Sequence, residues 1–425
     1  MGSAVAKEGS PLRVHWIIPT RVAPGSGGMR TIVQVVSELA SRGHEVTVSV
    51  SHEAYDPAEV EGVLCESYGM RGARVVAKDE VPARCDLAVA TEWRTALPVK
   101  RLDAKNKAYF VQDFEPWFMP MGYEQIQARL SYTYGFKAVC IGRWLPHKLA
   151  DEAGMSAASF DFGVDTSVYR PLDGTERKRA ICAVYQPEDK PRRCGRLLLE
   201  AMRIVHQLEP DVDINYFGSG WDGQELPGYP GKVRGVLAID ECNRLYNECS
   251  VGICLSASNP SRVPFEMMAA GLPVIDLHVQ NNVYDAIEAG ELLASPTPED
   301  LAAAVLSLLA DDGRRDAMGK AGASAMAGRA IENEAKTAAD LLECIGRGGT
   351  PDAGWADETS YSAEAFSLEG SAPEMAADVE HAVQEIERAE AVAAAEAEAA
   401  RAAQAAQDAP SPSLARRVAR KVLGR

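Results

Sequence analysis

The carboxylate of Glu266 is a candidate for ligand binding because of the elements expected around it. The sequence predicts an apolar strand at 251–255, a short helix at 263–270 and another strand at 273–275. Ligands of parallel α/β sheets bind where loops leave the carboxyl ends of such strands. Glu266 therefore has the type and position to hold hydroxyl groups of a ligand. The alternative is that it only stabilises the positive end of its own helix.

Three polar residues precede Glu266 in the same loop: Ser258, Asn259 and Ser261. With the ending Ala-Gly-Leu-Pro-Val, they make this segment similar to the nucleotide-sugar signature of glycosyltransferase family 4. The resemblance implies that Glu266 holds the ribose hydroxyls of a nucleotide and that the loop before it contacts the donor. Members of that family usually have a second Glu eight residues earlier, which holds sugar hydroxyls. Ser258 takes that position here.

The exchange at Ser258 resembles a subgroup of bacterial rhamnosyltransferases within family 4. That subgroup also shares a strand ending similar to residues 109–116. A deoxysugar offers fewer hydroxyls, so a shorter side chain suits it. The resemblance therefore implies dTDP-rhamnose as the donor.

Cations follow the strand expected at 180–185, namely Lys190, Arg192 and Arg193. Family 4 enzymes usually carry an Arg and, five residues later, a Lys that neutralise the diphosphate leaving group. The corresponding positions here are Pro187 and Arg192, so the first cation is lost and the second is kept in type. A guanidinium can stabilise a departing diphosphate without a metal. The alternative is a solvated basic turn.

A glycine-rich loop follows the strand expected at 13–19 and opens a helix. Backbone amides at Gly27 and Gly28 are suited to facing an anion. Arg30 stands where the third glycine of a dinucleotide fingerprint belongs, which disfavours a nicotinamide site. The family resemblance implies that the Gly-Gly loop approaches the donor phosphates from the opposite domain. A plain tight turn is the alternative.

Two further carboxylates, Asp113 and Glu115, follow the strand expected at 108–112 and have aromatic neighbours. Either carboxylate can act as a general base on an acceptor hydroxyl, while the aromatic rings hold a sugar face. Asp113 is the better candidate because it directly follows the strand. Helix capping or a core hydrogen bond is the alternative for both.

The order of elements predicts an α/β protein with two domains. One series of alternating strands and helices begins at residue 13 and a second begins at residue 180. Residues 162–171 between them are similar to the Gly-Val-Asp-Thr linker of family 4. The resemblance implies the GT-B arrangement, two Rossmann-like domains facing each other across a cleft. We place an acceptor-side domain at 11–160 and a nucleotide-sugar domain at 161–345.

The sequence changes character after residue 345. Residues 346–373 are rich in Gly, Ser, Asp and Glu and predict a linker. Residues 374–425 begin with an Ala- and Glu-rich segment that favours a solvated helix. They end in a basic amphipathic stretch, 414–425, whose composition suits a peripheral membrane contact. Loose pairing of this basic end with the acidic helix is the alternative.

Composition excludes several classes of protein. The 425 residues are 46% apolar and 25% charged, as in a globular protein, and the net charge of −17 disfavours nucleic-acid binding. There is no apolar run long enough to span a bilayer and no secretory leader. Nine cysteines without a Cys-x-x-Cys pair indicate a reducing cytoplasm and no structural zinc. The expected location is cytoplasmic, including the inner face of the membrane.

These observations and the family resemblance predict a glycosyltransferase of the hexosyltransferase type. It would transfer rhamnose from a nucleotide diphosphate donor to a glycan or lipid-linked glycan in polysaccharide biosynthesis. No cofactor or metal is expected, because the Asp-x-Asp at 211–213 stands at the start of a strand and no histidines cluster. A noncatalytic GT-B scaffold that binds a partner through its tail is the alternative, and an NAD-dependent oxidoreductase is disfavoured.

Overall fold

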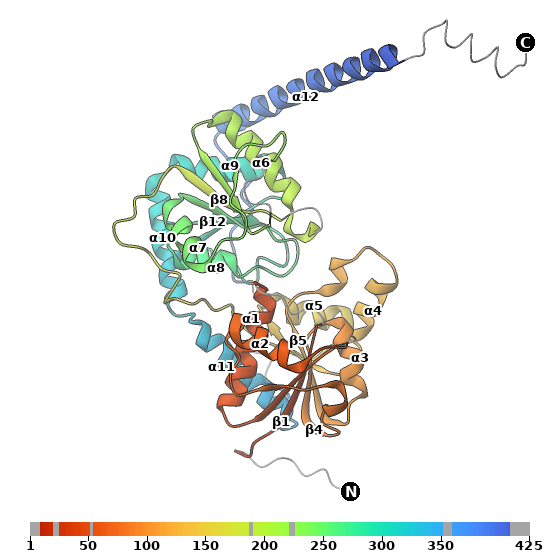
Figure 1. Ribbon diagram of the computed structural model, residues 1–425. Coiled ribbons are helices and arrows are strands. Elements are labelled where there is room, and N and C mark those ends of the chain that lie inside the picture. Colours follow the sequence, from red (N-terminus) through yellow and green to blue (C-terminus); the bar gives the residue numbers. More distant parts are fainter. Residues whose placement is uncertain are drawn as a thin grey trace, which may run out of the picture.

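The computed structural model describes residues 9–19, 25–51, 54–186, 190–220, 226–351 and 359–408, without the side chains of 405–408. Figure 1 shows two α/β bodies and a long C-terminal helix that projects from the second body. Pro187 and the basic end at 414–425 lie outside the described residues.

The first domain is built on a seven-stranded parallel sheet in the order β3-β2-β1-β4-β5-β6-β7. Its central strands are buried on both faces, as expected of a parallel sheet covered by helices. The strands are β1 (Arg13–Ile18), β2 (Glu45–Val50), β3 (Arg74–Val75), β4 (Cys85–Ala90), β5 (Ala104–Val111), β6 (Lys137–Ile141) and β7 (Ala157–Phe160). The helices are α1 (Gly27–Ser41), α2 (Pro57–Tyr68), α3 (Trp93–Arg101), α4 (Tyr123–Ser131) and α5 (Trp144–Ala153), with short 3-10 turns η1 (Lys78–Glu80) and η2 (Glu115–Phe118).

The second domain repeats this plan with a six-stranded parallel sheet in the order β10-β9-β8-β11-β12-β13. The strands are β8 (Ala180–Val184), β9 (Asp213–Phe217), β10 (Lys232–Val233), β11 (Val251–Ile253), β12 (Val274–Leu277) and β13 (Glu291–Ala294). The helices are α6 (Gly195–Leu208), α7 (Ile239–Glu248), α8 (Val263–Ala269), α9 (Pro298–Ala310) and α10 (Asp312–Ala327), and the turn η3 (Pro191–Arg193) precedes α6. The prediction of two Rossmann-like domains is therefore confirmed.

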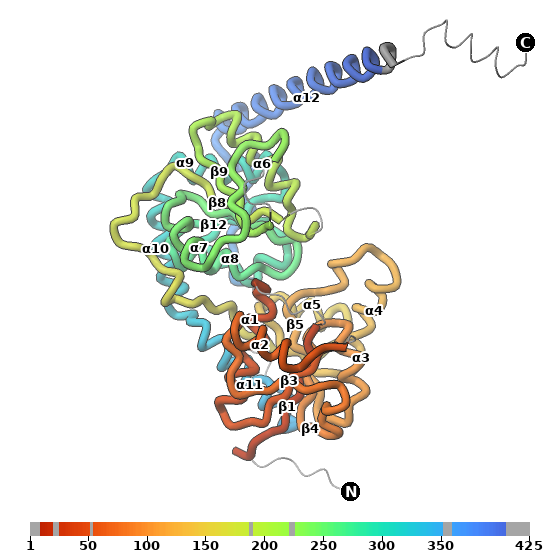
Figure 2. Tube along the Cα trace, viewed as in Figure 1, coloured from red at the N-terminus to blue at the C-terminus, as the bar shows by residue number. Residues whose placement is uncertain are grey.

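The predicted boundary at residue 345 needs a correction. Helix α11 (Ile331–Gly346) packs on β4 to β7 and on α1, so it belongs to the first domain, although the sequence assigned it to the second. Figure 2 shows α11 beside α1. Ala338, Leu342 and Ile345 are buried there. The chain therefore crosses back before residue 331, because the first sheet needs this apolar helix face to cover it.

The predicted linker and the predicted solvated helix are also partly wrong. Residues 359–371 pack on the second domain, where the backbone amide of Tyr361 donates to Val283 O and that of Phe366 to Leu293 O. The turn η4 (Leu368–Gly370) leads into α12 (Pro373–Asp408). Val379 and Ala382 bury the first turns of α12 on α6 and α9, whereas the remainder projects into solvent (Figure 1).

A buried ion pair connects the two domains and the segment at 162–171 that joins them. Arg262 precedes α8 in the second domain and donates to both carboxylate oxygens of Glu334 on α11, at 2.6 and 2.8 Å. It also donates to Thr31 Oγ1 on α1 at 2.8 Å. Glu334 in turn accepts the amide of Gly163 at 2.6 Å. A Cβ at Gly163 would lie 2.9 Å from the Cα of Ile331, so only glycine fits the linker at this point.

We expect Arg262→Met to destabilise the protein by about 3–5 kcal/mol, because Glu334 would remain buried without its partner. Urea denaturation measures this as a lower midpoint. The matched control is Lys232→Met, which breaks an exposed pair with Asp213 and should cost at most about 1 kcal/mol. If both variants unfolded at the same urea concentration, the ion pair would not hold the domains.

Candidate functional site

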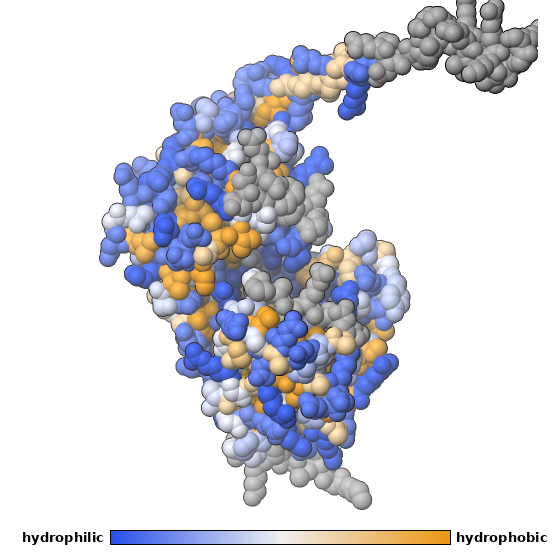
Figure 3. Space-filling view, viewed as in Figure 1, coloured by the Kyte–Doolittle hydropathy of each residue, from blue (hydrophilic) through white to orange (hydrophobic). Residues whose placement is uncertain are grey.

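The predicted site residues gather where the carboxyl ends of the two sheets face each other. Strand order reverses between β1 and β4 in the first sheet and between β8 and β11 in the second, and ligands of such sheets bind at these reversals. The molecular surface is hollowed between the second domain and the first (Figure 3). Loops that follow β5, β8 and β11 meet at this place, as the contacts below establish.

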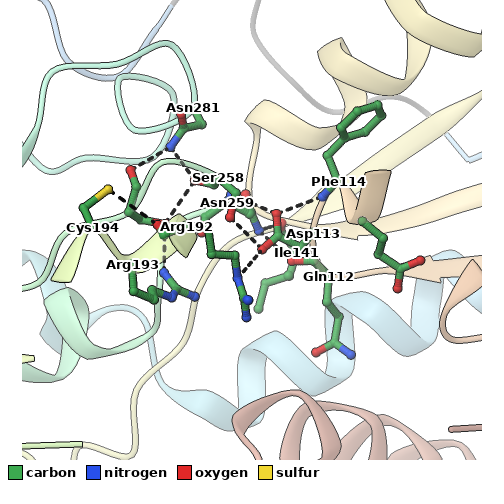
Figure 4. A network of polar contacts seen from close by, with 12 residues as sticks. Gln112, Asp113, Phe114, Ile141, Arg192, Arg193, Cys194, Ser258, Asn259 and Asn281 are labelled. Carbon is green, nitrogen blue, oxygen red and sulfur yellow. Dashed lines mark hydrogen bonds and ion pairs between the residues drawn. The ribbon is translucent and has the colours of Figure 1, made fainter. Parts of the chain in front are cut away.

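Asp113 joins the two domains. It follows β5, and its Oδ1 accepts the backbone amides of Phe114 at 2.8 Å and Asn259 at 3.0 Å. Its Oδ2 accepts from the hydroxyl of Ser258 at 2.9 Å (Figure 4). Burial raises the pKa of Asp113, and Arg193 and the Asn259 amide oppose that rise. Both oxygens thus already have partners in this arrangement, and Oδ2, which accepts from Ser258 alone, keeps one acceptor position for a further hydroxyl.

Asn259 fastens the loop after β11 onto the first sheet. Its Nδ2 donates to the carbonyl oxygens of Gln112 and Ile141, each at 3.0 Å, at the ends of β5 and β6. The Gln112 side chain then turns toward the start of α1, where a Cβ at Gly28 would lie 3.2 Å from Gln112 Oε1. The predicted glycine pair is therefore the first turn of α1, capped by Ser26, and lies against the same loop.

Arg192 and Arg193 form the cationic part of the site. The Arg192 guanidinium lies 4.2 Å from the centre of the Phe118 ring, and its Nε is 3.7 Å from Asp113 Oδ2. This Nε is buried without a hydrogen-bond partner. Burial and the neighbouring Arg193 lower the pKa of Arg192. Arg193 donates to the hydroxyl of Ser256 at 2.8 Å, so one guanidinium is fixed and the other has a donor available for an anion.

Glu266 lies on the buried side of α8, with 8% of its surface exposed. The hydroxyl of Tyr169, from the linker, hydrogen-bonds to it. Burial raises the pKa of Glu266, and the positive charges of Arg262 and Arg30 oppose that rise. Arg30 belongs to the first turn of α1, so the predicted glycine turn and Glu266 come together from opposite domains. The sequence does not predict Tyr169 as a partner of Glu266, although Tyr169 lies in the segment 162–171 that resembles the family 4 linker.

Glu115 and Ser261 each bond backbone amides at the start of a helix. Glu115 Oε2 accepts the amide of Trp93 at 2.7 Å, at the start of α3, and the hydroxyl of Tyr109 at 3.0 Å. These contacts match the capping and core role that the sequence left open, and the catalytic role of Glu115 stays a prediction. Ser261 Oγ accepts the amide of Val263 at the start of α8. Its contact with the donor also stays a prediction.

Asp285 is a contact between the domains that sequence reasoning missed. It follows β12 in the second domain and accepts the amides of Arg143 at 2.9 Å and Trp144 at 3.4 Å, at the start of α5 in the first. Burial raises the pKa of Asp285 to about 6, against the effect of these amides. No local pattern around residue 285 indicates this partner, since 142 positions separate it from Arg143.

Two features, a metal-binding group and a membrane-spanning helix, are absent from the described part of the chain. Within it, no three His, Cys, Asp or Glu side chains come together in a group that could hold a metal ion. No helix there combines the length and the apolar character needed to cross a bilayer.

Known proteins resemble both the sequence and the fold. Residues 179–306 match the family described as WsaF, C-terminal domain. The chain is 30% identical over 333 residues to the O-antigen biosynthesis protein RfbC of Myxococcus xanthus, covering 75% of this chain and 26% of that protein. It therefore spans about a quarter of the length of that relative. The spore coat protein SA of Bacillus subtilis is 22% identical over 336 residues, covering 69% of this chain and 88% of that protein.

Solved structures share the two-domain arrangement. Anabaena Alr3699/HepE, in complex with UDP-glucose, superposes with a TM-score of 0.60 at 14% identity over 79% of this chain and all of its own. WaaG, a glycosyltransferase involved in lipopolysaccharide biosynthesis, has a TM-score of 0.56 at 15% identity, covering 77% of this chain and 99% of its own. The chain has the GT-B fold.

The half-buried position of Glu115 predicts a pH dependence of stability. Burial and the nearby Glu92 raise the pKa of Glu115 to about 8 in the folded protein. The unfolded chain releases this proton near pH 4.5, so the group's contribution to stability is complete below that pH and declines as the pH rises to about 8. Glu115→Gln cannot ionise and should gain stability relative to the wild type between pH 5.5 and 8.5 in urea denaturation. Glu396→Gln, on the exposed part of α12, is the control and should change nothing; the same result for Glu115→Gln would contradict the argument.

Proposed function

We propose that the protein is a glycosyltransferase that moves a sugar from a nucleotide diphosphate donor to a glycan or lipid-linked glycan. The observation that carries this proposal is the buried Nε of Arg192, which makes no hydrogen bond and only a 3.7 Å ion pair with Asp113, next to Arg193 and at the strand reversal of the second sheet. An unpaired buried donor costs stability unless a ligand satisfies it. A diphosphate anion has the charge and the acceptor oxygens for that purpose.

The remaining parts of the donor have matching residues in the loop after β11. Glu266 offers carboxylate oxygens to the pentose of the nucleotide, of which dTDP has only the 3′-hydroxyl free, and the positive charges of Arg30 and Arg262 oppose the rise in its pKa that burial causes. As the bond to the sugar breaks, negative charge grows on the departing diphosphate. The guanidinium groups of Arg192 and Arg193 stabilise that charge in a partly buried place, where such stabilisation is strongest. The amides of Gly27 and Gly28 open α1 on the other side.

The family resemblance and the comparisons support a role in polysaccharide assembly. The Myxococcus relative is named for O-antigen biosynthesis, and the Anabaena structure holds UDP-glucose. Rhamnose, carried by dTDP, is the proposed sugar, because Ser258 offers a short hydroxyl where a longer carboxylate would grip more hydroxyls. Asp113 is the proposed base for the acceptor, since it is the first-domain carboxylate next to Arg192.

A noncatalytic role is the second candidate, and one observation favours it. Each oxygen of Asp113 accepts a bond from the second domain, and with the Phe114 amide three of its roughly four acceptor positions are taken, so the residue already has a structural role. A scaffold would bind nucleotide sugars weakly or not at all and would show no turnover. Measurement of turnover with a radiolabelled nucleotide sugar separates the two functions.

Glu266→Gln should weaken nucleotide binding by about 1.5–3 kcal/mol, the contribution of a hydrogen bond to a charged group. The change keeps the size of the side chain, so folding should persist. Calorimetry with dTDP, UDP and GDP measures the affinity, and dTDP should bind best. The matched control is Glu299→Gln, on the outside of α9, which should bind like the wild type. Equal affinity of Glu266→Gln and wild type would remove the ribose assignment.

Transfer should not require a divalent metal, because Arg192 and Arg193 supply the positive charge for the leaving group. We expect full turnover after treatment with EDTA and dialysis. Arg192→Gln should lower kcat about 100-fold, by the size of effects at comparable charge-stabilising groups. Loss of activity in EDTA with recovery in Mg²⁺ or Mn²⁺ would show that a metal, not this guanidinium pair, carries the phosphate charge.

A further inference from the structure

Exposed apolar side chains are concentrated on one part of the first domain. Of the ten large apolar residues that are exposed in the described chain, seven lie between residues 97 and 130. We use the term apolar face for five of them, Leu97 on α3, Met121 before α4, and Tyr123, Ile126 and Leu130 on α4. Concentrations of this kind on a protein surface mark interaction sites rather than chance exposure.

Helix α4 has its polarity reversed relative to an ordinary surface helix. Tyr123, Ile126 and Leu130, spaced three and four apart, are exposed by 75%, 55% and 44%. The opposite side of the helix buries Gln125, Ala128 and Ser131. A surface helix normally buries its apolar stripe and exposes its polar one. The fold therefore holds α4 with its apolar side outward. This exposed apolar area is unfavourable in water unless another surface covers it.

Cations border the apolar face. Helix α3 exposes Arg94, Lys100 and Arg101, and α4 carries Arg129. Arg94 is ion-paired with Glu124 and Arg129 with Glu152, so Lys100 and Arg101 supply the excess positive charge. A 3.2 Å ion pair from Arg94 to Glu124 joins α3 and α4, so these charges belong to one surface. The chain as a whole carries a net charge of −17, so a basic border is a local exception. Apolar side chains surrounded by Arg and Lys suit a surface made of anionic lipid headgroups.

We propose that the apolar face docks on an anionic phospholipid bilayer. Tyr123, Ile126 and Met121 would enter the headgroup region, and the basic border would attract the lipid charges. This surface differs from the basic end at 414–425, which lies outside the described residues.

The face continues into the candidate site. Trp117 and Phe118 on η2 lie between α4 and the loop after β8, and the Phe118 ring is in contact with Arg192. Docking through α4 would therefore bring the opening between the domains close to the bilayer surface. Access of a lipid-linked acceptor to Arg192 is a consequence that rests on the proposed function, whereas the docking itself does not.

The test is sedimentation of the full chain with phosphatidylcholine vesicles, with and without phosphatidylglycerol, in the absence of any substrate. All proteins carry Ser in place of Arg416, Arg417, Arg420, Lys421 and Arg425, so the basic end contributes no cationic side chain. The variant Met121→Ser/Tyr123→Ser/Ile126→Ser should lose binding to anionic vesicles by about tenfold or more. Binding of the parent should fall in high salt, because lipid charges are screened.

The matched control changes the other three exposed apolar residues, in Val236→Ser/Ile239→Ser/Val392→Ser. It should bind vesicles like the parent, and thermal unfolding should be the same for all three proteins. Equal vesicle binding by the α4 variant and the parent would overturn the proposal. So would a parent that does not bind vesicles but sediments as a dimer, with the α4 variant a monomer, because a second copy would then cover the face. Equal binding to neutral and anionic vesicles would overturn the choice of an anionic surface.

Discussion

The arrangement of the two domains depends on a buried bidentate ion pair between Arg262 and Glu334. Its atoms also bond Thr31 on α1 and the linker at Gly163, so one guanidinium touches both domains and the segment that joins them. Burial of two charges is unfavourable in itself and is offset only by close geometry and full hydrogen bonding. We infer that the pair specifies one relative position of the sheets, because any other position would leave Glu334 buried and unpaired.

That position brings polar groups of both sheets into contact at the candidate site. Asp113, Asn259 and Asp285 each bond backbone or side-chain groups of the opposite domain. These bonds satisfy polar atoms that would otherwise be buried without partners. A donor and an acceptor must enter the same region, so ligand binding and contact between the domains compete for the same groups. Among the described residues of the site, Arg192 Nε and Asn259 Oδ1 are buried without a hydrogen bond.

Buried polar groups need hydrogen-bond partners and exposed apolar area needs a cover, and these two requirements bear on Glu115 and on helix α4. Glu115 accepts the amide of Trp93 at the start of α3, because the first amides of a helix lack partners within it. Helix α4 instead leaves apolar area in water, since its buried side is occupied by Gln125, Ala128 and Ser131. The first feature is complete within the chain, whereas the second requires a surface outside it.

Local patterns were sufficient for the centre of each sheet and for part of the site. The predicted strands at 13–19 and 180–185 correspond to β1 and β8, because continuous apolar runs between turn residues identify strands buried on both faces. The edge strands β3, β7, β10 and β13 were missed, since edge strands of two to four residues carry too little pattern. Polar residues at strand ends pointed to Asp113, Arg192, Ser258, Asn259 and Glu266. Only the tertiary structure decided that α11 covers the first sheet, that Asp285 caps α5 and that Arg262 meets Glu334. Those partners lie 72 or more positions apart, and their choice follows from how two sheets pack rather than from any neighbouring residue.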